Sequence, residues 1–457
     1  MPLAAVNRMD CRPGSGARAF VLATLCLMAT LAAEPRVKLK VGPQVRMSDP
    51  GAAHAEPHIA AHPRDRNKLI AAAMHFLGEQ QTLVETYSSN NGGATWSLSH
   101  LPRLREALGG KEMIVAADPW VAYAPDGTVH ASVVASMNRD HAWGRLPLLF
   151  YRSRNGGLSW QEPAVVGPFF DRVAFIVSSG DNRKEIFGAG MAVTDPSGPT
   201  AVGVLRSLDD GATFERVLIH PSNLGHNALN PVVAPDGALI VPYVDFPARI
   251  REQFELRRRL MRTSRIFVVA SKDGGRTFGL PRLVADIPRF DAGFPTLAVD
   301  PTSGARRGRL YLAWNGESAE LRNVTIARSD DAGETWQATS VKASGSGPAY
   351  FSSLAVSPQG IVGLAWIQHE AQEGNPRCWR TYFAASSDGG VTFSVPEVVS
   401  GARPSCPDTQ LKGHLRERGG DYLGLAAGAD GTFHVAWPDG RDRTMQISTT
   451  AIQVRVE

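Results

Sequence analysis

Short apolar segments recur in pairs along the chain, and each has the length of a β-strand rather than of a helix. A representative pair is formed by residues 119–127 (PWVAYAPDG) and 128–134 (TVHASVV), which meet at a Pro-Asp-Gly turn. Segments of this kind, bounded by turn residues, predict antiparallel strands joined by tight turns. We interpret each pair as the first two strands of a sheet. The other pairs are 57–63 with 68–74, 191–198 with 200–207, 231–237 with 238–244, 295–301 with 309–314 and 352–360 with 361–366.

A polar octet follows each pair and occurs six times, at intervals of 54 to 64 residues. It contains Ser, then Asn or Asp two positions later, Gly four positions later, and Thr or Ser before a final aromatic residue. The Asx side chain can bond the backbone two residues on, and Gly permits a positive φ, so the octet predicts a turn between two strands. We expect the aromatic residue to pack between neighbouring sheets. The octets run from Ser89 to Trp96, Ser153 to Trp160, Ser207 to Phe214, Ser271 to Phe278, Ser329 to Trp336 and Ser386 to Phe393.

This octet resembles the Asp-box, or BNR repeat, of the sialidase-like superfamily, whose pattern is S-x-D-x-G-x-T-W. The resemblance extends over about residues 50–450. It implies an all-β protein, a β-propeller built from four-stranded antiparallel blades. It is less specific for activity, because such boxes also occur in propellers that only bind a ligand.

Two observations bear on the number of blades. Six octets favour six blades, as in the sialidases of this family, whereas the length of residues 34–457 divided by the mean interval favours seven, which we prefer. A seventh group lacks an octet and supplies three strands, at 422–431, 432–437 and 445–454. We expect residues 37–48 to add its fourth strand and so close the ring.

The N-terminus has the pattern of a secretory signal peptide. Three arginines precede an apolar segment at residues 19–33, and we predict that residues 1–33 are removed on export. The alternative is a membrane anchor, but the segment is shorter than the ~20 apolar residues that span a bilayer. We therefore expect a secreted or periplasmic protein without stable membrane insertion, in which residues 34–457 form a single propeller domain.

Composition excludes several functions. The chain has 48 Lys and Arg against 44 Asp and Glu, and a formal charge of +4 is too small for a dedicated nucleic-acid binder. No phosphate-binding or dinucleotide motif is present, so we predict no cofactor. Of the four cysteines, only Cys378 and Cys406 follow the signal segment. They form either a disulfide or two buried thiols, and two are too few for a cysteine-based metal site.

The antiparallel topology predicts where polar chemistry gathers. The starts of the first strands and the loops between the second and third strands share one face of a propeller, and the octets share the other. Glu56 and His58 lie at the start of the first inner strand, Asp118 and Trp120 at the start of the second, and Tyr422 near the start of the last. We therefore expect a site on this face, over the centre of the ring.

The resemblance implies roles for these residues. Retaining sialidases use a tyrosine nucleophile with a glutamate partner, an aspartate acid/base and three arginines. A neutral phenol avoids the repulsion that a carboxylate nucleophile would meet at sialic acid. On this pattern Tyr422 is the nucleophile, Glu56 activates it, and Asp118 is the general acid/base. The alternative for Glu56 and Asp118 is a structural bond to the start of the adjacent blade.

The chain departs from the family in its arginines. The first inner strand of the family carries an arginine where this chain reads Glu56-Pro57-His58-Ile59. Loop arginines on the same face could hold an acidic group instead. With His58 and Trp120 they complete the predicted substrate-binding set. These arginines are Arg139, Arg249 and Arg441.

We predict no metal centre. His54, Glu56 and His58 alternate and would face one way in a regular strand, but a triad from a single strand rarely closes a metal site. Two functions remain open. One is an exo-acting glycoside hydrolase of sialidase type that acts on a glycan or glycoconjugate. The other is a non-catalytic propeller that binds a carbohydrate or a protein. The sequence does not indicate an oligomeric state.

Overall fold

The computed structural model describes residues 37–77, 81–103, 115–136, 146–169, 171–180, 183–192, 200–219, 225–246, 264–287, 294–315, 323–342, 347–372, 375, 377–407, 419–442 and 444–457. The predicted signal segment, residues 1–33, lies outside them. Pro35–Glu457 form one compact unit. Every regular element in the described ranges is a β-strand, and among them no helix is long and apolar enough to cross a membrane. The protein is therefore all-β.

Consecutive strands pair antiparallel in groups of about four, as the apolar segments predict. The first two groups are β3 (Ala53–Ala61), β4 (Leu69–Leu77), β5 (Gln81–Ser89) and β6 (Ser97–His100), then β7 (Val115–Tyr123), β8 (Val129–Ser136), β9 (Leu146–Ser153) and β10 (Ala164–Phe169). The third is β11 (Ala174–Gly180), β12 (Arg183–Ala192), β13 (Ala201–Ser207) and β14 (Glu215–Ile219). The fourth is β15 (Gly225–Ala228), β16 (Val232–Val233), β17 (Leu239–Phe246), β18 (Ser264–Ser271) and β19 (Arg282–Ile287).

The remaining groups repeat this arrangement. They are β20 (Thr296–Val299), β21 (Leu310–Asn315), β22 (Asn323–Ser329) and β23 (Gln337–Lys342), then β24 (Ala349–Val356), β25 (Val362–His369), β26 (Trp379–Ser386) and β27 (Glu397–Val398). The last joins both ends of the described chain: β28 (Gly424–Ala427), β29 (Phe433–Asp439) and β30 (Gln446–Val456) with β1 (Val37–Val41) and β2 (Val45–Arg46).

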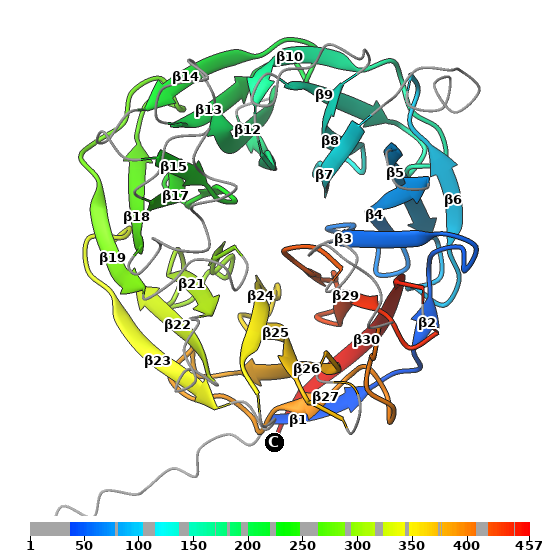
Figure 1. Ribbon diagram of the computed structural model, residues 1–457. Coiled ribbons are helices and arrows are strands. Elements are labelled where there is room, and N and C mark those ends of the chain that lie inside the picture. Colours follow the sequence, from blue (N-terminus) through cyan, green and yellow to red (C-terminus); the bar gives the residue numbers. More distant parts are fainter. Residues whose placement is uncertain are drawn as a thin grey trace, which may run out of the picture. The chain divides into compact units, whose positions relative to one another are not determined.

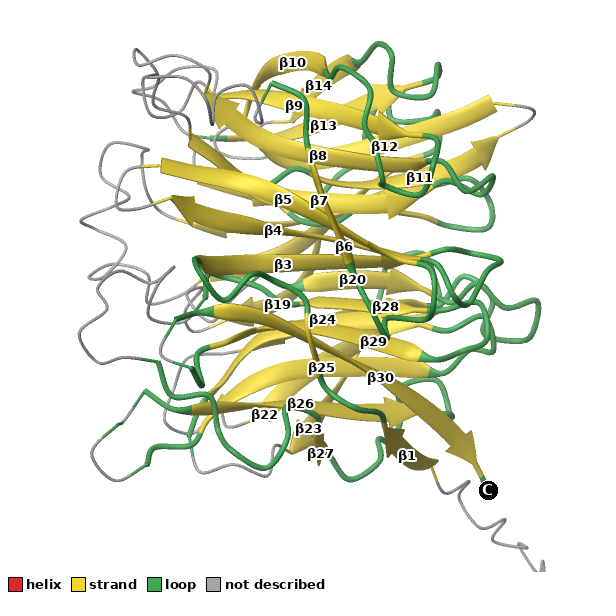
Figure 2. Cartoon of the chain, turned by 90° about the vertical axis from the view of Figure 1, so that its right-hand side faces the viewer, coloured by secondary structure: helices red, strands yellow, loops and turns green. Residues whose placement is uncertain are grey.

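The described strands are arranged in groups side by side around a common centre, and β3, β7 and β24 lie near it (Figure 1). The side view in Figure 2 shows the strands running between two opposite faces. The chain ends pair directly, since β1 lies antiparallel to β30 with Val37 opposite Val456. The last group also packs against the first, through a cluster that includes Met47, Tyr87 and Ile447.

The octets form the predicted turns. In the second octet the Ser153 hydroxyl donates to Asn155 Oδ1 at 2.9 Å and accepts from the Gly157 amide at 2.9 Å. Trp160 then enters the apolar cluster shared by the first two groups, where its indole nitrogen donates to Thr86 at 3.0 Å. The expected packing of the octet aromatics between sheets is thus confirmed here. The other final aromatics, Trp96, Phe214, Phe278, Trp336 and Phe393, also pack against buried clusters.

Two details refine the sequence interpretation. Residues 191–198 were expected to begin the third group, but they overlap β12, its second strand, and the first strand is β11. The segment 194–198 (TDPSG) has the turn residues that end first strands elsewhere, which explains the error. Cys378 and Cys406 form a disulfide, the first of the two alternatives.

Candidate active site

Three inner strands share the same irregularity near their start. The register shifts at residues 55–58 in β3, at 117–120 in β7 and between Tyr350 and Ser353 in β24. Inside each bulge one residue other than glycine adopts a left-handed backbone: Glu56 (φ 53°), Asp118 (φ 57°) and Phe351 (φ 56°). Such a conformation costs roughly 1–3 kcal/mol and persists only where the surrounding structure imposes it. Two of these three strained positions carry the carboxylates predicted to be functional.

The sequence predicted that the side chains of His54, Glu56 and His58 would face the same side of a regular strand. The bulge in β3 interrupts this regular strand, so they do not. His54 lies against Glu85, with Nε2 3.0 Å from Oε2. His58 instead stacks on Trp120, with the ring centroids 3.6 Å apart. The two imidazoles therefore do not share a site with Glu56, because the extra residues of a bulge turn the following side chains.

Glu56 and Asp118 form an interacting pair of carboxyl groups. Burial raises the pKa of Glu56 well above its usual value, and the charge of Asp118 and a hydrogen bond to it raise it further. Burial, together with the charge of Asp171, raises the pKa of Asp118 to about 8. At neutral pH the pair therefore retains at least one proton. The contact also joins the starts of two neighbouring groups, the structural role that the sequence left open.

An arginine that the sequence did not indicate lies beside this pair. The Arg172 side chain is 2% exposed. Its guanidinium carbon lies 4.4 Å from the ring centre of Phe294, 5.0 Å from that of Tyr422 and 5.3 Å from that of Trp120. Within the described part of the chain, its Nε and Nη2 have no hydrogen-bond partner. Buried donors on a charged group are costly to leave unpaired, so this guanidinium is suited to bind an anion.

Tyr422 is buried in the same cluster. Its hydroxyl donates to the carbonyl of Pro119 at 3.4 Å. Burial raises the pKa of Tyr422 far above its usual value, and the charges of Glu56 and Asp118 raise it further. The phenol is therefore neutral at rest and needs a base before it can attack a substrate.

The segment before Tyr422 holds Glu56 in place. The Glu56 amide donates to the carbonyl of Gly419 at 2.9 Å. Gly420 has φ +100°, and a Cβ at this position would overlap Cγ of Glu56. Two independent reasons therefore favour glycine at position 420: its backbone has a positive φ, and the Glu56 side chain leaves no space for a Cβ.

His58 and Trp120, which the sequence predicts to bind substrate, lie beside Arg172 and Asp118 in the same cluster. The indole nitrogen of Trp120 donates to the carbonyl of Phe175 at 2.9 Å, which fixes the ring. The Nδ1 atom of His58 accepts from the Val121 amide at 3.2 Å. Burial and the charge of Arg172 lower the pKa of His58 to about 3, so the imidazole is neutral.

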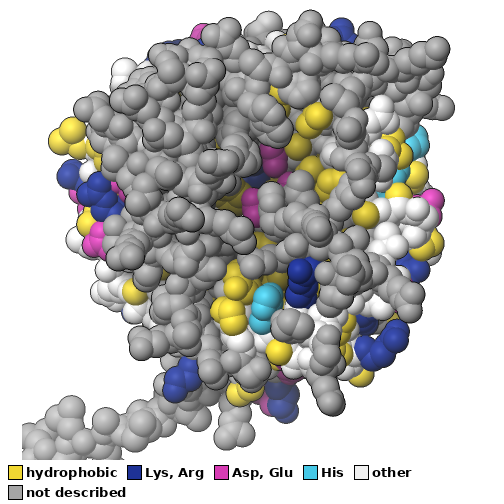
Figure 3. Space-filling view, in the orientation of Figure 1, with side chains coloured by type: hydrophobic (Ala, Val, Ile, Leu, Met, Phe, Trp, Pro, Cys, Tyr) yellow, Lys and Arg dark blue, Asp and Glu magenta, His cyan; other side chains and the backbone are white. Residues whose placement is uncertain are grey.

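The residues of the cluster differ in their exposure. Asp118, His58 and Trp120 are half-buried, whereas Glu56 and Tyr422 are buried beneath them. Figure 3 shows acidic and basic side chains at the middle of this face. A ligand that enters here would meet Asp118 and the rings of His58 and Trp120 before it reached Tyr422.

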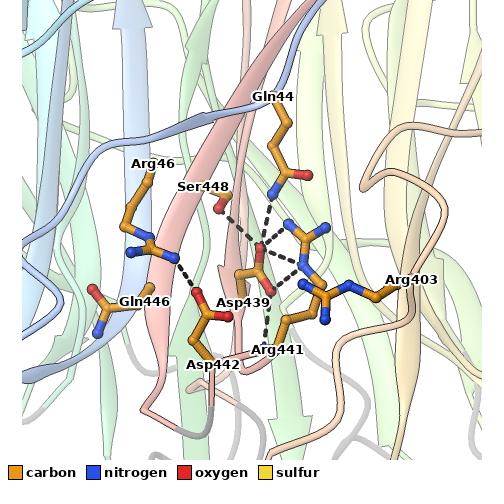
Figure 4. A pocket seen from close by; sticks show the side chains of 8 residues that line it. All are labelled: Gln44, Arg46, Arg403, Asp439, Arg441, Asp442, Gln446 and Ser448. Carbon is orange, nitrogen blue, oxygen red and sulfur yellow. Dashed lines mark hydrogen bonds and ion pairs between the residues drawn. The ribbon is translucent and has the colours of Figure 1, made fainter.

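Among the predicted loop arginines, only Arg441 belongs to the described residues, and it does not contact this cluster. Arg139 and Arg249 lie outside the described residues. Arg441 lines a separate pocket of about 270 Å³, where it pairs with Asp439 and its Nη1 donates to the carbonyl of Ser400 (Figure 4). Its guanidinium is thus already paired with a neighbouring carboxylate.

Arg172 had a recognisable signal in the sequence. The pair Asp171-Arg172 stands just before β11, as Glu56 and Asp118 stand near the starts of β3 and β7. Because β12 was interpreted as the first strand of its group, the true start of this group was not searched. The correct strand order would have placed Arg172 on the polar face.

Comparisons with known proteins agree with the fold. No family model and no curated protein matches the chain. The structure is similar to a protein of unknown function from Dyadobacter fermentans DSM 18053, with a TM-score of 0.52 and 12% identity over 91% of this chain and 99% of that one. It is also similar to phage phi92 endosialidase, with a TM-score of 0.51 and 13% identity over 90% and 69% of the two chains.

Another similar structure is the Hadza microbial sialidase Hz136, with a TM-score of 0.47 and 12% identity over 92% of each chain. Two of these neighbours are thus described as a sialidase and an endosialidase. At these identities the similarity concerns the fold, which is that of a propeller-like protein built from antiparallel sheets.

Proposed function

We propose that this protein is an exported glycoside hydrolase of sialidase type that removes an acidic sugar from a glycan. One observation carries the proposal: Arg172, a buried arginine with unpaired N–H groups, lies beside Tyr422 and the protonated carboxyl pair. This arrangement combines an anion-binding group, a nucleophile, a base and an acid within one cluster.

Each group has a role in the proposed reaction. Arg172 binds the sugar carboxylate. The proton that the pair retains first shifts from Glu56 to Asp118 across the hydrogen bond between them. Ionised Glu56 then takes the phenolic proton while the Tyr422 oxygen bonds to the anomeric carbon, and Asp118 donates its proton to the departing glycosidic oxygen. Asp118 then takes a proton from a water molecule, whose oxygen replaces Tyr422 at the anomeric carbon, and the phenol recovers its proton from Glu56. A carboxylate nucleophile would repel the acidic substrate, whereas a phenol does not.

We further propose that residues 34–457 form a single ring of seven blades, closed where β1 adds to β30, after removal of residues 1–33 on export. The pairing of β1 with β30 and the packing of the last group against the first support closure. Closure matters for the site, because Glu56 near the start of the first blade and Tyr422 near the start of the last must stay together.

The second candidate is a propeller that binds an acidic carbohydrate without turning it over. It is favoured by the absence of the family arginine before Ile59 and by the hydroxyl of Tyr422, which bonds to a backbone carbonyl. The same cluster would then serve recognition through Arg172 and Trp120.

A panel of fluorogenic glycosides separates the two candidates. We expect turnover of at least one glycoside with a carboxylate on its terminal sugar, such as an α-sialoside, and none of its neutral counterpart. Saturable binding of acidic glycans without turnover of any member would reject the hydrolase and support the binding protein. An absence of both binding and turnover would reject both.

A further inference from the structure

A second cluster of chemically competent side chains lies on the first group of strands, away from the carboxyl pair. His54 on β3 is the cross-strand neighbour of His75 on β4, and Glu85 lies on the adjacent strand β5. Glu85 Oε2 is 3.0 Å from Nε2 of His54, and Oε1 is 2.8 Å from Nδ1 of His75. The three ligand atoms lie within 4.8 Å of one another.

The hydrogen bonds around this cluster orient its nitrogen atoms. Nδ1 of His54 is 3.1 Å from the carbonyl of Ala52, which can only accept, so Nδ1 carries a proton. The lone pair of a neutral His54 therefore lies on Nε2 and faces the carboxylate of Glu85. Two acceptors face each other across 3.0 Å, and this arrangement requires a cation between them: either a proton on Nε2 or a metal ion.

The neighbouring imidazole makes the metal ion the better solution. His75 stacks on His54 with the ring centroids 4.7 Å apart and bonds the same carboxylate. A proton can bridge only one imidazole nitrogen and one carboxylate oxygen, whereas a divalent ion can accept lone pairs from both imidazoles and from the carboxylate, whose ligand atoms all lie within 4.8 Å of one another. One divalent ion bound to two neutral imidazoles and one carboxylate uses all three donors at once.

The donor set and its supports match the requirements of a zinc-type ion. Two imidazole nitrogens and a carboxylate are the three protein ligands of many open zinc sites, at bonds of roughly 2.0–2.2 Å. Ligands of this kind are held by outer hydrogen bonds. Here the Ala52 carbonyl holds His54, and the Tyr87 hydroxyl donates to Glu85 Oε2 at 2.6 Å. The side chain of His75 is 14% exposed, so the cluster reaches the surface of the protein at this residue.

We propose that His54, His75 and Glu85 bind one divalent first-row transition metal ion, such as zinc. The ion would join strands β3, β4 and β5. These strands lie next to the last group, in which β1 and β30, from the two ends of the described chain, pair with each other. The Ala52 carbonyl that orients His54 also accepts from Gln446 of β30 at 2.8 Å, and Tyr87 packs against Met47 and Ile447. The ion therefore has a structural role, independent of the hydrolase proposal, and stabilises the start of the strand that carries Glu56.

Titration of the tag-free, chelator-treated full chain with zinc chloride tests the proposal. We expect one bound ion per chain, a rise in Tm of several degrees on zinc addition, and its reversal by chelator. Cobalt chloride should give the visible absorption bands of a four- or five-coordinate ion. Absence of stoichiometric zinc binding, or a Tm that zinc does not change, would overturn the proposal and leave a protonated histidine–glutamate pair.

Variants locate the ion. His75→Gln, at the most exposed ligand, should weaken zinc binding by ~100-fold or more, and Tyr87→Phe, which removes an outer hydrogen bond, by ~10-fold. His100→Gln on neighbouring β6, also half-buried, is the matched control and should bind zinc as the wild type does. Equal zinc affinity for His75→Gln and the wild type would place any bound ion elsewhere and so overturn the assignment.

Discussion

The carboxyl groups of Glu56 and Asp118 form a pair because both occupy the left-handed position of the same bulge in neighbouring inner strands. Each is followed by a proline, which has no N–H to leave unpaired at the interrupted ladder. The repeat of backbone geometry thus places two like charges together, and the pair can exist at neutral pH only by retaining a proton.

The pair should make stability depend on pH. The pKa of Asp118 rises to about 8 on folding, so the folded state holds a proton that the unfolded state loses above about pH 4. The stabilising effect of this proton is complete below about pH 4 and is lost as the pH rises to about 8. Burial is the main cause of this raised pKa; the charges of Asp171 and Asp421 raise it further, and the hydrogen bond to Glu56 and the charge of Arg172 lower it.

Asp118→Asn removes the titration and keeps the shape. We expect it to raise the free energy of unfolding by up to about 5 kcal/mol at pH 8 relative to the wild type, with the difference shrinking toward pH 4–5. Thermal unfolding of both proteins from pH 4 to 9 measures this. A difference that does not vary with pH would contradict the raised pKa.

Tyr422→Phe tests the nucleophile. On the proposed mechanism kcat for an acidic glycoside falls by ~10³-fold or more, because the covalent step is lost, while substrate still binds through Arg172. The measurement is steady-state turnover together with direct glycan binding.

Tyr151→Phe is the matched control for this change. The Tyr151 hydroxyl also donates to a backbone carbonyl, that of Pro102, at 3.1 Å, and it lies in another buried cluster. Both variants lose one hydrogen bond of the same kind, so their stabilities should fall similarly, by about 1 kcal/mol. Equal activity in the two variants would show that the phenol of Tyr422 is structural.

Much of the fold could be predicted because each octet forms its turn through contacts between residues that are close in the sequence. A serine, an Asx residue and a glycine close each turn through contacts within five residues, as Ser153, Asn155 and Gly157 show. The positions of Glu56, Asp118 and Tyr422 near inner strand starts followed from this periodicity. Antiparallel topology then brought residues far apart in the sequence into one cluster.

The rest of the site depends on features without a local signal. The left-handed backbone at Glu56 and Asp118 is imposed by pairing with the next strand. The presence of Glu or Asp in the sequence does not indicate this conformation. Arg172 was missed because a turn-like segment after β12 shifted the strand order of its group by one. The loop that carries Arg441 was placed on the correct face by topology, yet its side chain is held by Asp439, a pairing that periodicity does not reveal.

Arg172→Gln tests anion recognition. Removing a charge-assisted, buried donor set should weaken binding of an acidic glycan by ~100-fold and leave binding of a neutral sugar largely unchanged. Arg172→Lys should recover only part of the loss, because an ammonium cannot donate in parallel to a carboxylate. Titration of both variants with acidic and neutral glycans measures this, and equal loss for both ligands would indicate a structural role.

The disulfide should contribute to stability through the unfolded state. Cys378 and Cys406 are separated by 28 residues, and closing a loop of this length stabilises a protein by about 3–4 kcal/mol. Replacing both cysteines by serine should lower Tm accordingly in thermal unfolding, without changing glycan binding, since the cluster around Arg172 does not include them. An unchanged Tm in the double variant would contradict this.

Gly420→Ala probes how the chain end positions Glu56. A methyl group here would overlap Cγ of Glu56 and also occupy a left-handed backbone position, so we expect both stability and turnover to fall. Gly237→Ala separates these two causes, because Gly237 has φ +85° but no atom lies within 4 Å of the added Cβ. It should lose about 1 kcal/mol from strain alone and keep full turnover. If Gly420→Ala behaves like Gly237→Ala in both measurements, the position of Glu56 does not depend on this contact, and its assignment as the base loses its structural support.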